Sequence, residues 1–310
     1  MNVDTKVEDD AIVPSIWKAP FFIGLGRAMV SLGPVSNTGY CPYQCRFCYV
    51  QGPFPKYASA TVNEIVSWLE DRRDQYDIVY ISGDTDSFAR PRTDEGLDLI
   101  EALLRLNVDV LFTTRHVFND YELERLGSIA IRYRSQQLLL IGCISISQLH
   151  HPELEPPPIK SPYDRVQLLQ KLQALGVITV LTIRPFIPSI AASEYSEIAS
   201  LGGEFADVVL GGDLYLDPNG AVFENLQAAI GTIDLATSPS RVRALDFSLS
   251  NEDWITLTHS EAVSQVNLAC ETIGKPFFMR SGSAIRWIRG RGRNSKVKGA
   301  ETSSNSDSPP

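Results

Sequence analysis

Residues 161–188 read SPYDRVQLLQKLQALGVITVLTIRPFIP, and they contain the unit that decides the fold. The first part, 161–176, predicts a helix, because Pro162 stands in its first turn and Gly176 at its end. The second part, 177–188, is an almost continuous apolar run that leads into two prolines, as a buried strand would. A helix followed at once by a buried strand indicates a chain in which the two elements alternate.

The same unit recurs about six times with short connections. Apolar residues at Val62, Ile65, Val66 and Leu69, for example, share one helix face. Apolar strands of this kind indicate an α/β fold with a parallel sheet covered by helices, and right-handed crossovers would close it into a barrel or partial barrel. Chemistry then gathers at the C-terminal ends of the strands. The predicted helices are 60–76, 93–107, 119–127 (capped by Asn119), 161–176 and 194–203, and the predicted strands are 77–83, 108–114, 137–147, 177–188 and 205–212.

Both ends of the chain are predicted to lie outside the domain. Residues 1–20 are interpreted as a flexible arm, and 289–310 as a disordered polar tail whose first half is basic. Residues 251–274 are predicted to be helical, and 276–288 to form a last strand or a cover. We therefore expect one domain over residues 21–288.

Composition and charge restrict the possible functions. The 310 residues carry a formal net charge of −9, so the chain lacks the broad attraction to phosphate backbones that supplies most non-specific nucleic-acid affinity. The sequence contains no run of about 18 apolar residues, so it predicts no membrane span. The first residues are polar and acidic, unlike a secretory signal, and we expect a cytoplasmic protein with reduced thiols.

Three of the five cysteines stand together in residues 40–50, YCPYQCRFCYV. Cys41, Cys45 and Cys48 are too few for a structural zinc site, which takes four ligands, unless a distant histidine completes it. They are also too few for an ordinary [4Fe–4S] electron carrier, which takes four cysteines. A cluster held by these three thiolates would keep one iron without a protein ligand, and that iron could bind a substrate or cofactor.

The spacing C-x₃-C-x₂-C, with Phe47 just before the last cysteine, is similar to the signature of the radical S-adenosylmethionine (radical SAM) enzymes. The resemblance covers residues 34–215 and implies a partial (β/α)6 TIM-type barrel that is open on one side. It implies that Cys41, Cys45 and Cys48 hold a [4Fe–4S] cluster and that S-adenosylmethionine chelates the fourth iron. The reduced cluster then cleaves the cofactor to a 5′-deoxyadenosyl radical, which abstracts hydrogen from a substrate.

The same resemblance assigns a binding site for S-adenosylmethionine to the strand ends. The stretch ISGD at 81–84 would receive the amino group, with Asp84 where the family commonly has Glu. Arg184 would hold the carboxylate, although a structural ion pair is an equally good explanation. Thr113, Arg115 and His116 are further candidate contacts. The implied cofactor-binding residues are Phe47, Tyr49, Ser82, Gly83, Asp84, Ser145, Ser147, Arg184 and Gly211.

The stretches SGDTDSF and FTTRH and residues 155–188 resemble the branch of the family that contains spore photoproduct lyase. We do not transfer its DNA-repair activity, because the chain is acidic and no C-terminal cysteine matches a hydrogen donor. Cys143 and Cys270 are interpreted as core residues. We expect a peptide substrate in ribosomal peptide natural-product maturation, such as backbone splicing, with a separate peptide-recognition protein and an external electron donor. Lesion repair of nucleic acid and a non-catalytic iron–sulfur or zinc protein are the alternatives, and no catalytic acid, base or hydrogen donor is identified.

Overall fold

A computed structural model of the chain describes residues 21–24, 26–32, 41–48, 60–83, 85–217, 220–231, 233, 240–243 and 254–302. Of these, residues 21, 22, 240–243, 254 and 292–302 are described by their backbone alone. None of the helices in this part of the chain combines the length and the apolar character that crossing a membrane requires.

Six strands form a parallel sheet in chain order, from β2 to β7, and each pairs with the next. At one edge β1 (Phe21–Gly24) pairs antiparallel with β2. At the other, β9 (Trp254–Leu257) and then β8 (Ser240–Arg243) continue the sheet antiparallel from β7. The sheet does not close on itself, which confirms the predicted partial barrel. The parallel strands are β2 (Arg27–Val30), β3 (Ile78–Ile81), β4 (Asp109–Thr114), β5 (Leu140–Ser145), β6 (Ile178–Phe186) and β7 (Val208–Leu216).

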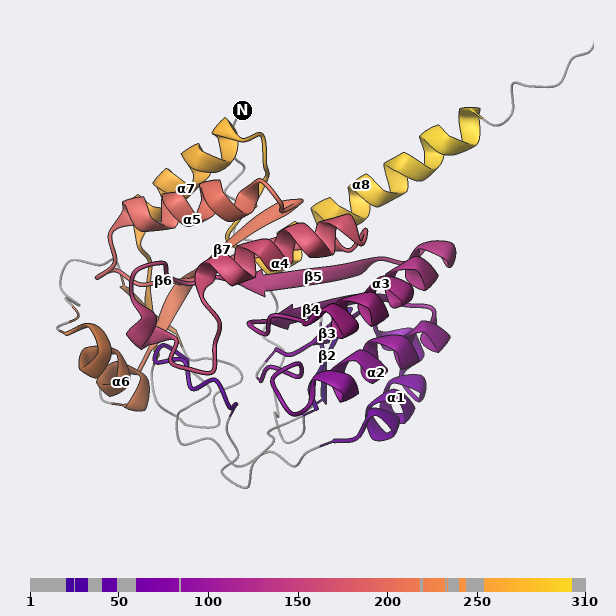
Figure 1. The fold of residues 1–310 in the computed structure, drawn as a ribbon, viewed down its shortest axis with the longest axis horizontal. Helices are drawn as coiled ribbons and strands as arrows, with labels where there is room; N and C mark the ends of the chain where they lie inside the picture. Colours follow the sequence, from indigo (N-terminus) through magenta and orange to yellow (C-terminus); the bar gives the residue numbers. More distant parts are fainter. Residues whose placement is uncertain are drawn as a thin grey trace, which may run out of the picture.

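Helices connect the parallel strands and cover one face of the sheet (Figure 1). Their starts are encoded locally, because the side chains of Thr61, Asn119 and Ser161 each accept a hydrogen bond from a backbone N–H three residues on, within a capping box. Asn119 is therefore the cap that the sequence predicts, although its helix is longer than expected. The helices are α1 (Val62–Glu70), α2 (Thr93–Leu103), α3 (Asp120–Ser135), α4 (Pro162–Ala174), α5 (Ala192–Gly203) and α6 (Ala221–Ile230), with short 3₁₀ turns η2 (Arg73–Gln75), η3 (Leu104–Leu106) and η4 (Pro152–Leu154).

The strands bury side chains on both faces, as parallel strands do. Val79 and Phe112 belong to the main core that the sheet forms with the helices. Their neighbours Ile78 and Leu111 point to the opposite face, here called the inner face, because successive side chains of a strand alternate. The inner face packs against α8 (Ser281–Thr302), whose contributing residues are Ala284, Ile285 and Ile288.

The C-terminal part differs from the prediction in one place and agrees with it in another. Residues 254–257 form strand β9, not the start of a helix, because the exposed edge of β7 at Leu214–Leu216 pairs with them. The helix in this stretch is α7 (Ser260–Thr272). Residues 277–278 form β10 (Phe277–Phe278), which runs parallel to β7, and α8 then supplies the predicted cover.

The expected disordered tail begins inside α8. The guanidinium Nε of Arg289 lies 3.0 Å from the carboxylate of Asp109, at the start of β4, and the helix backbone continues to Thr302. This contact and the packing of Ile288 hold the helix against the sheet at the point where its composition becomes polar. The arm at 1–20 and residues 303–310 lie outside the described residues.

Candidate functional site

The cysteine loop follows β2 and contacts the segments that follow β3, β4 and β5. The backbone N–H of Arg46 donates to the carbonyl of Leu154, in the turn after β5, at 3.0 Å. Within the loop, the N–H of Cys48 donates to the carbonyl of Cys45 at 3.0 Å. Cys45 is buried and Cys41 and Cys48 are half-buried. The loop therefore sits at the C-terminal ends of the strands, where the fold gathers its chemistry.

Burial affects the ionisation of two of the three thiols. Burial raises the pKa of Cys41 and of Cys45 to about 12, and at Cys41 the charge of Asp86 adds to this effect. The backbone N–H groups of Tyr43 and Asp86 act in the opposite direction by donating to the sulfur of Cys41. Thiols of this kind ionise when a metal replaces the proton.

The donor set suits a cluster better than a single ion. Among the described residues no three Cys, His, Asp or Glu side chains are grouped closely enough to hold one metal ion. A [4Fe–4S] cluster instead gives each thiolate its own iron. Three thiols in one short loop thus fit a cluster with one iron open to a further ligand.

A buried carboxylate lies beside Cys41. Asp86 accepts hydrogen bonds from the hydroxyl of Thr114 at 2.9 Å, from the N–H of Arg115 at 2.7 Å and from the N–H of Phe88 at 3.0 Å. The Thr114 oxygen also accepts from the N–H of His116, so its own proton points to the carboxylate. Burial raises the pKa of Asp86, whereas these donors stabilise the ionised form.

A buried charge network lies beside Cys45 and Cys48. Arg115 donates from Nε to Glu155 at 2.8 Å and from Nη2 to the hydroxyl of Ser147 at 3.3 Å. Its guanidinium also stands over the ring of Phe47, 5.4 Å from the centroid. On the other side of Glu155, Arg165 donates to both carboxylate oxygens. One anion is therefore enclosed between two cations.

The predicted residues after β3 stand next to the end of β2. Ser82 donates its N–H to the carbonyl of Val30 at 3.1 Å and accepts at its hydroxyl from the N–H of Ser87 at 2.8 Å. Its φ of 70° is in the left-handed region that non-glycine residues seldom adopt, and such residues concentrate at functional sites. Gly83 adjoins Met29, whose Cε would stand 2.6 Å from a Cβ at that position. Asp84 and Tyr49 lie outside the described residues.

The two predicted serines, Ser145 at the end of β5 and Ser147 just after it, are buried. The hydroxyl of Ser147 donates to the carbonyl of Arg184 and accepts from Arg115, so both its functions are used within the chain. The carbonyl of Ser145 accepts from Arg165.

Arg184 joins three segments of its own chain. Its guanidinium donates to the carbonyl of Gly211 at 2.6 Å, to the hydroxyl of Ser281 at 3.0 Å and to the carbonyl of Met279 at 3.0 Å. These partners favour the structural explanation of the arginine. At Gly211 a Cβ would stand 2.7 Å from the ring of Phe186, so close packing already accounts for this glycine.

The other candidates have structural partners. His116 is buried and lies 3.1 Å from Glu122, which also accepts from the N–H of the helix cap Asn119. Cys143 lies on the inner face and Cys270 in α7, and both are buried as predicted.

Sequence reasoning missed Asp86, Glu155 and Arg165. An acidic residue soon after a predicted strand end could have indicated Asp86. The pairing of Glu155 with Arg115 joins positions 40 residues apart in the sequence, and no local pattern reveals it.

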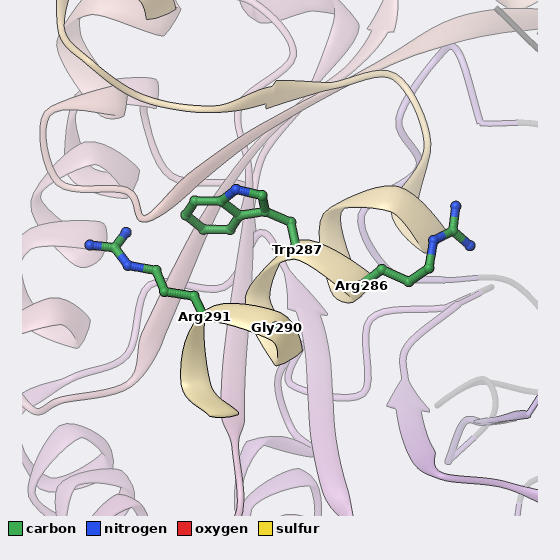
Figure 2. Close-up of a pocket in the computed structure, with 4 residues that line it drawn as sticks. All are labelled: Arg286, Trp287, Gly290 and Arg291. Carbon is green, nitrogen blue, oxygen red and sulfur yellow. The ribbon is translucent and has the colours of Figure 1, made fainter. Parts of the chain in front are cut away.

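A shallow pocket of about 350 Å³ on α8 lies away from this site (Figure 2). Its lining consists of Arg286, Trp287, Gly290 and Arg291, and the guanidinium of Arg291 stands 5.4 Å from the centroid of the Trp287 ring. The adjacent Arg289 contacts Asp109 at the start of β4, so this part of α8 is at the N-terminal ends of the strands. The pocket therefore belongs to the end of the sheet opposite the cysteines.

Residues 35–202 match the model of the Radical SAM superfamily. No curated protein matches the chain by sequence. Among solved structures, a single-site mutant of spore photoproduct lyase aligns with a TM-score of 0.60 and 12% identity, over 86% of this chain and 79% of that chain. A double mutant of the same enzyme with bound AdoMet and dinucleoside spore photoproduct has a TM-score of 0.57 and 11% identity, over 82% and 76%. The radical S-adenosylmethionine methyltransferase TsrM from Kitasatospora setae, with cobalamin and a [4Fe–4S] cluster bound, has a TM-score of 0.52 and 12% identity, over 80% of this chain and 52% of that chain.

These structural likenesses show the fold, and the match to the superfamily model covers more than half of the chain. The cysteines at 41, 45 and 48 stand within the matched residues. The superfamily consists of enzymes that use a [4Fe–4S] cluster and S-adenosylmethionine, and this chain belongs to it.

Proposed function

We propose that this radical SAM enzyme abstracts hydrogen from a peptide during the maturation of a ribosomally made natural product, with backbone splicing as one possible outcome. The observation that carries the radical chemistry is the loop with Cys41, Cys45 and Cys48 at the C-terminal ends of the strands. These three residues would hold the cluster. When bound, the cluster and S-adenosylmethionine supply the 5′-deoxyadenosyl radical.

The chain's own residues would bind and orient the cofactor. Ser82 and Gly83 are the best-supported contacts, because they directly follow β3 in the segment that contains Asp86, whose N–H donates to the sulfur of Cys41. We propose Asp84 and Tyr49 for the same site from the sequence alone. Phe47, Ser145, Ser147, Arg184 and Gly211 would shape this site through the contacts described above, with Arg184 linking β6 to Gly211 in β7 and to Met279.

The proposed peptide substrate rests on charge. The chain has a formal net charge of −9. The arginines Arg115, Arg165 and Arg184 near the strand ends are all bonded to groups of the chain itself. Such cations are poorly placed to neutralise a phosphate backbone, which nucleic-acid binding relies on. Peptide binding does not require neutralisation of a phosphate backbone. A separate peptide-recognition protein would bind the substrate, and an external electron donor would reduce the cluster.

Anaerobic reconstitution with iron and sulfide tests the radical chemistry. We expect [4Fe–4S] absorption and, after reduction with S-adenosylmethionine present, release of 5′-deoxyadenosine. Replacing Cys41, Cys45 and Cys48 together by alanine should remove both signals. Cys270→Ala is the matched control, because it deletes a buried thiol in α7 and should keep both. If the triple variant keeps both the [4Fe–4S] absorption and the release of 5′-deoxyadenosine, the proposed cluster site is refuted.

Deuterium transfer tests the substrate class without knowledge of the product. The reconstituted enzyme is incubated with dithionite, S-adenosylmethionine and either a library of perdeuterated peptides or an ultraviolet-irradiated, perdeuterated thymine duplex. Abstraction from a peptide should place deuterium in 5′-deoxyadenosine. Deuterium arriving only from the duplex would replace the peptide with a nucleic-acid lesion as the substrate.

A further inference from the structure

Charges of opposite sign flank the cysteine loop. The carboxylate of Asp86 lies on the side of Cys41, whose sulfur accepts a hydrogen bond from the Asp86 N–H. The guanidinium of Arg115 interacts electrostatically with Cys45 and Cys48 and covers the ring of Phe47. Both groups are half-buried, so water screens their fields less than it would at an exposed surface.

Arg115 belongs to a network with a net charge of +1. Its two arginines share the single carboxylate of Glu155, and the side chains of Arg165 and Glu155 are 0% and 1% exposed. Burying a charge without a counter-charge is costly. An anion nearby offsets this excess charge: the Asp86 carboxylate accepts from the N–H of Arg115, and the thiolates that a metal would create at Cys45 and Cys48 are further anions.

Arg115 is also held rigidly. Glu155 fixes its Nε at 2.8 Å, Ser147 accepts from its Nη2, and the Phe47 ring lies beneath the guanidinium plane. Glu155 is fixed in turn by Arg165 and by the side-chain amide of Gln148 at 3.2 Å. A cation held in this way stabilises a charge that appears beside it without first having to reorient, as preorganised dipoles do in active sites.

We propose that the fixed charges of Arg115 and Asp86 set the reduction potential of the [4Fe–4S] cluster in opposite directions, with Arg115 raising it and Asp86 lowering it. This rests on the proposed function, because it requires a cluster at Cys41, Cys45 and Cys48. Reduction adds one negative charge to a group already bound by three thiolates. A neighbouring cation favours that step and a neighbouring anion opposes it, since net charge and surroundings set the potentials of such clusters. Arg115 and Asp86 are thus positioning residues for the redox step.

The test is a mediator titration of the reconstituted protein, without S-adenosylmethionine and at one pH, with the reduced cluster followed by electron paramagnetic resonance. Arg115→Gln removes the charge and keeps a hydrogen-bond donor for Glu155. It should make the one-electron reduction about tenfold less favourable, which corresponds to about 59 mV. Arg115→Lys keeps the charge and should stay near the parent value. Asp86→Asn should shift the potential upward.

Arg125→Gln is the matched control. It removes the same charge from α3, where Arg125 pairs with Asp98 and Glu101 of α2. This substitution should leave the reduction potential unchanged. If the parent protein binds no cluster, the proposed function itself fails. If the cluster forms but Arg115→Gln leaves the potential unchanged or raises it, the inference is overturned. Should Arg115→Gln not fold, an unchanged or lowered potential in Asp86→Asn overturns it equally.

Discussion

At the scale of single residues, Glu155 is the acid on which the buried charges depend. Burial alone would raise its pKa, but the charges of Arg165 and Arg115 and their hydrogen bonds lower the pKa of Glu155 to about 2. The carboxylate therefore stays ionised inside the protein at neutral pH. Removing one partner of such a pair leaves an uncompensated buried charge, which costs more than the intact pair contributes.

Glu155→Gln should accordingly lower the free energy of unfolding by roughly 3–5 kcal/mol at pH 7, because two buried arginines lose their anion. The pH dependence has a defined sign. A carboxyl group with a depressed pKa stabilises the fold above its unfolded value of 4.5, and this contribution disappears as the pH falls through about 2. Urea denaturation of the anaerobic apoprotein at several pH values measures both the loss of stability at pH 7 and its pH dependence.

Glu124→Gln is the control for this substitution, since Glu124 is exposed on α3. It should change the stability little at any of these pH values. A Glu155→Gln protein as stable as the Glu124→Gln protein would show that the two arginines find other counter-charges.

At the scale of elements, α2 is tied to the loop that carries Ser82 and Asp86. A Cβ at Gly96 would stand 2.7 Å from the carbonyl oxygen of Ser87 and 2.8 Å from the Phe88 ring. Thr93, in the first turn of α2, also donates its hydroxyl to the carbonyl of Phe88 at 2.8 Å. The helix thus supports the loop beside Cys41 through a close backbone approach.

Gly96→Ala should lower the melting temperature despite the better helix propensity of alanine, because backbone and an aromatic ring would both have to move, at a cost of about 1–3 kcal/mol. Gly290→Ala is the matched substitution in α8, where nothing stands within 4 Å of the added Cβ. It should stabilise the protein by up to about 1 kcal/mol. Thermal unfolding of both variants measures these effects. A rise of the melting temperature in both variants would show that the loop with Ser82 and Asp86 moves freely away from α2.

Elements with local signals were predictable from the sequence, and long-range pairings were not. Asn119 predicts the start of α3, and the apolar run at 177–188 contains β6. Strand β9 exists because β7 offers it an edge, and nothing within residues 254–257 reveals that edge. In the same way, the position of Arg184 at a strand end was visible, but its partners Met279 and Ser281 are 95 and 97 residues away. The cysteines were found because their ligand spacing is itself local.

At the scale of the whole molecule, the two ends of the sheet have different tasks. The cysteine loop and the residues that bond it gather at the C-terminal ends of the strands. Toward the N-terminal ends, α8 covers the inner face, with Ile285 and Ile288 packed against Ile78, Leu111 and Val208. Arg184 links the two, because it donates to Ser281 at the start of α8 and to Gly211 in β7. The inner face of the partial barrel is therefore covered by a helix whose first residues the sequence predicts as a cover and whose later residues it predicts as a polar tail.

Ile285→Asp tests whether this cover stabilises the fold. The new carboxylate would be placed against the apolar inner face, and an unpaired buried charge costs roughly 3–5 kcal/mol. Burial raises the pKa of such a group, so the loss of stability should shrink as the pH falls and the carboxyl group becomes neutral. Ser283→Asp introduces the same charge two residues away, where Arg286 already donates to the Ser283 hydroxyl at 3.2 Å, and should cost little. Urea denaturation at pH 5 and at pH 8 measures both variants. Equal stability of the two at pH 8 would mean that α8 leaves the inner face without unfolding the rest.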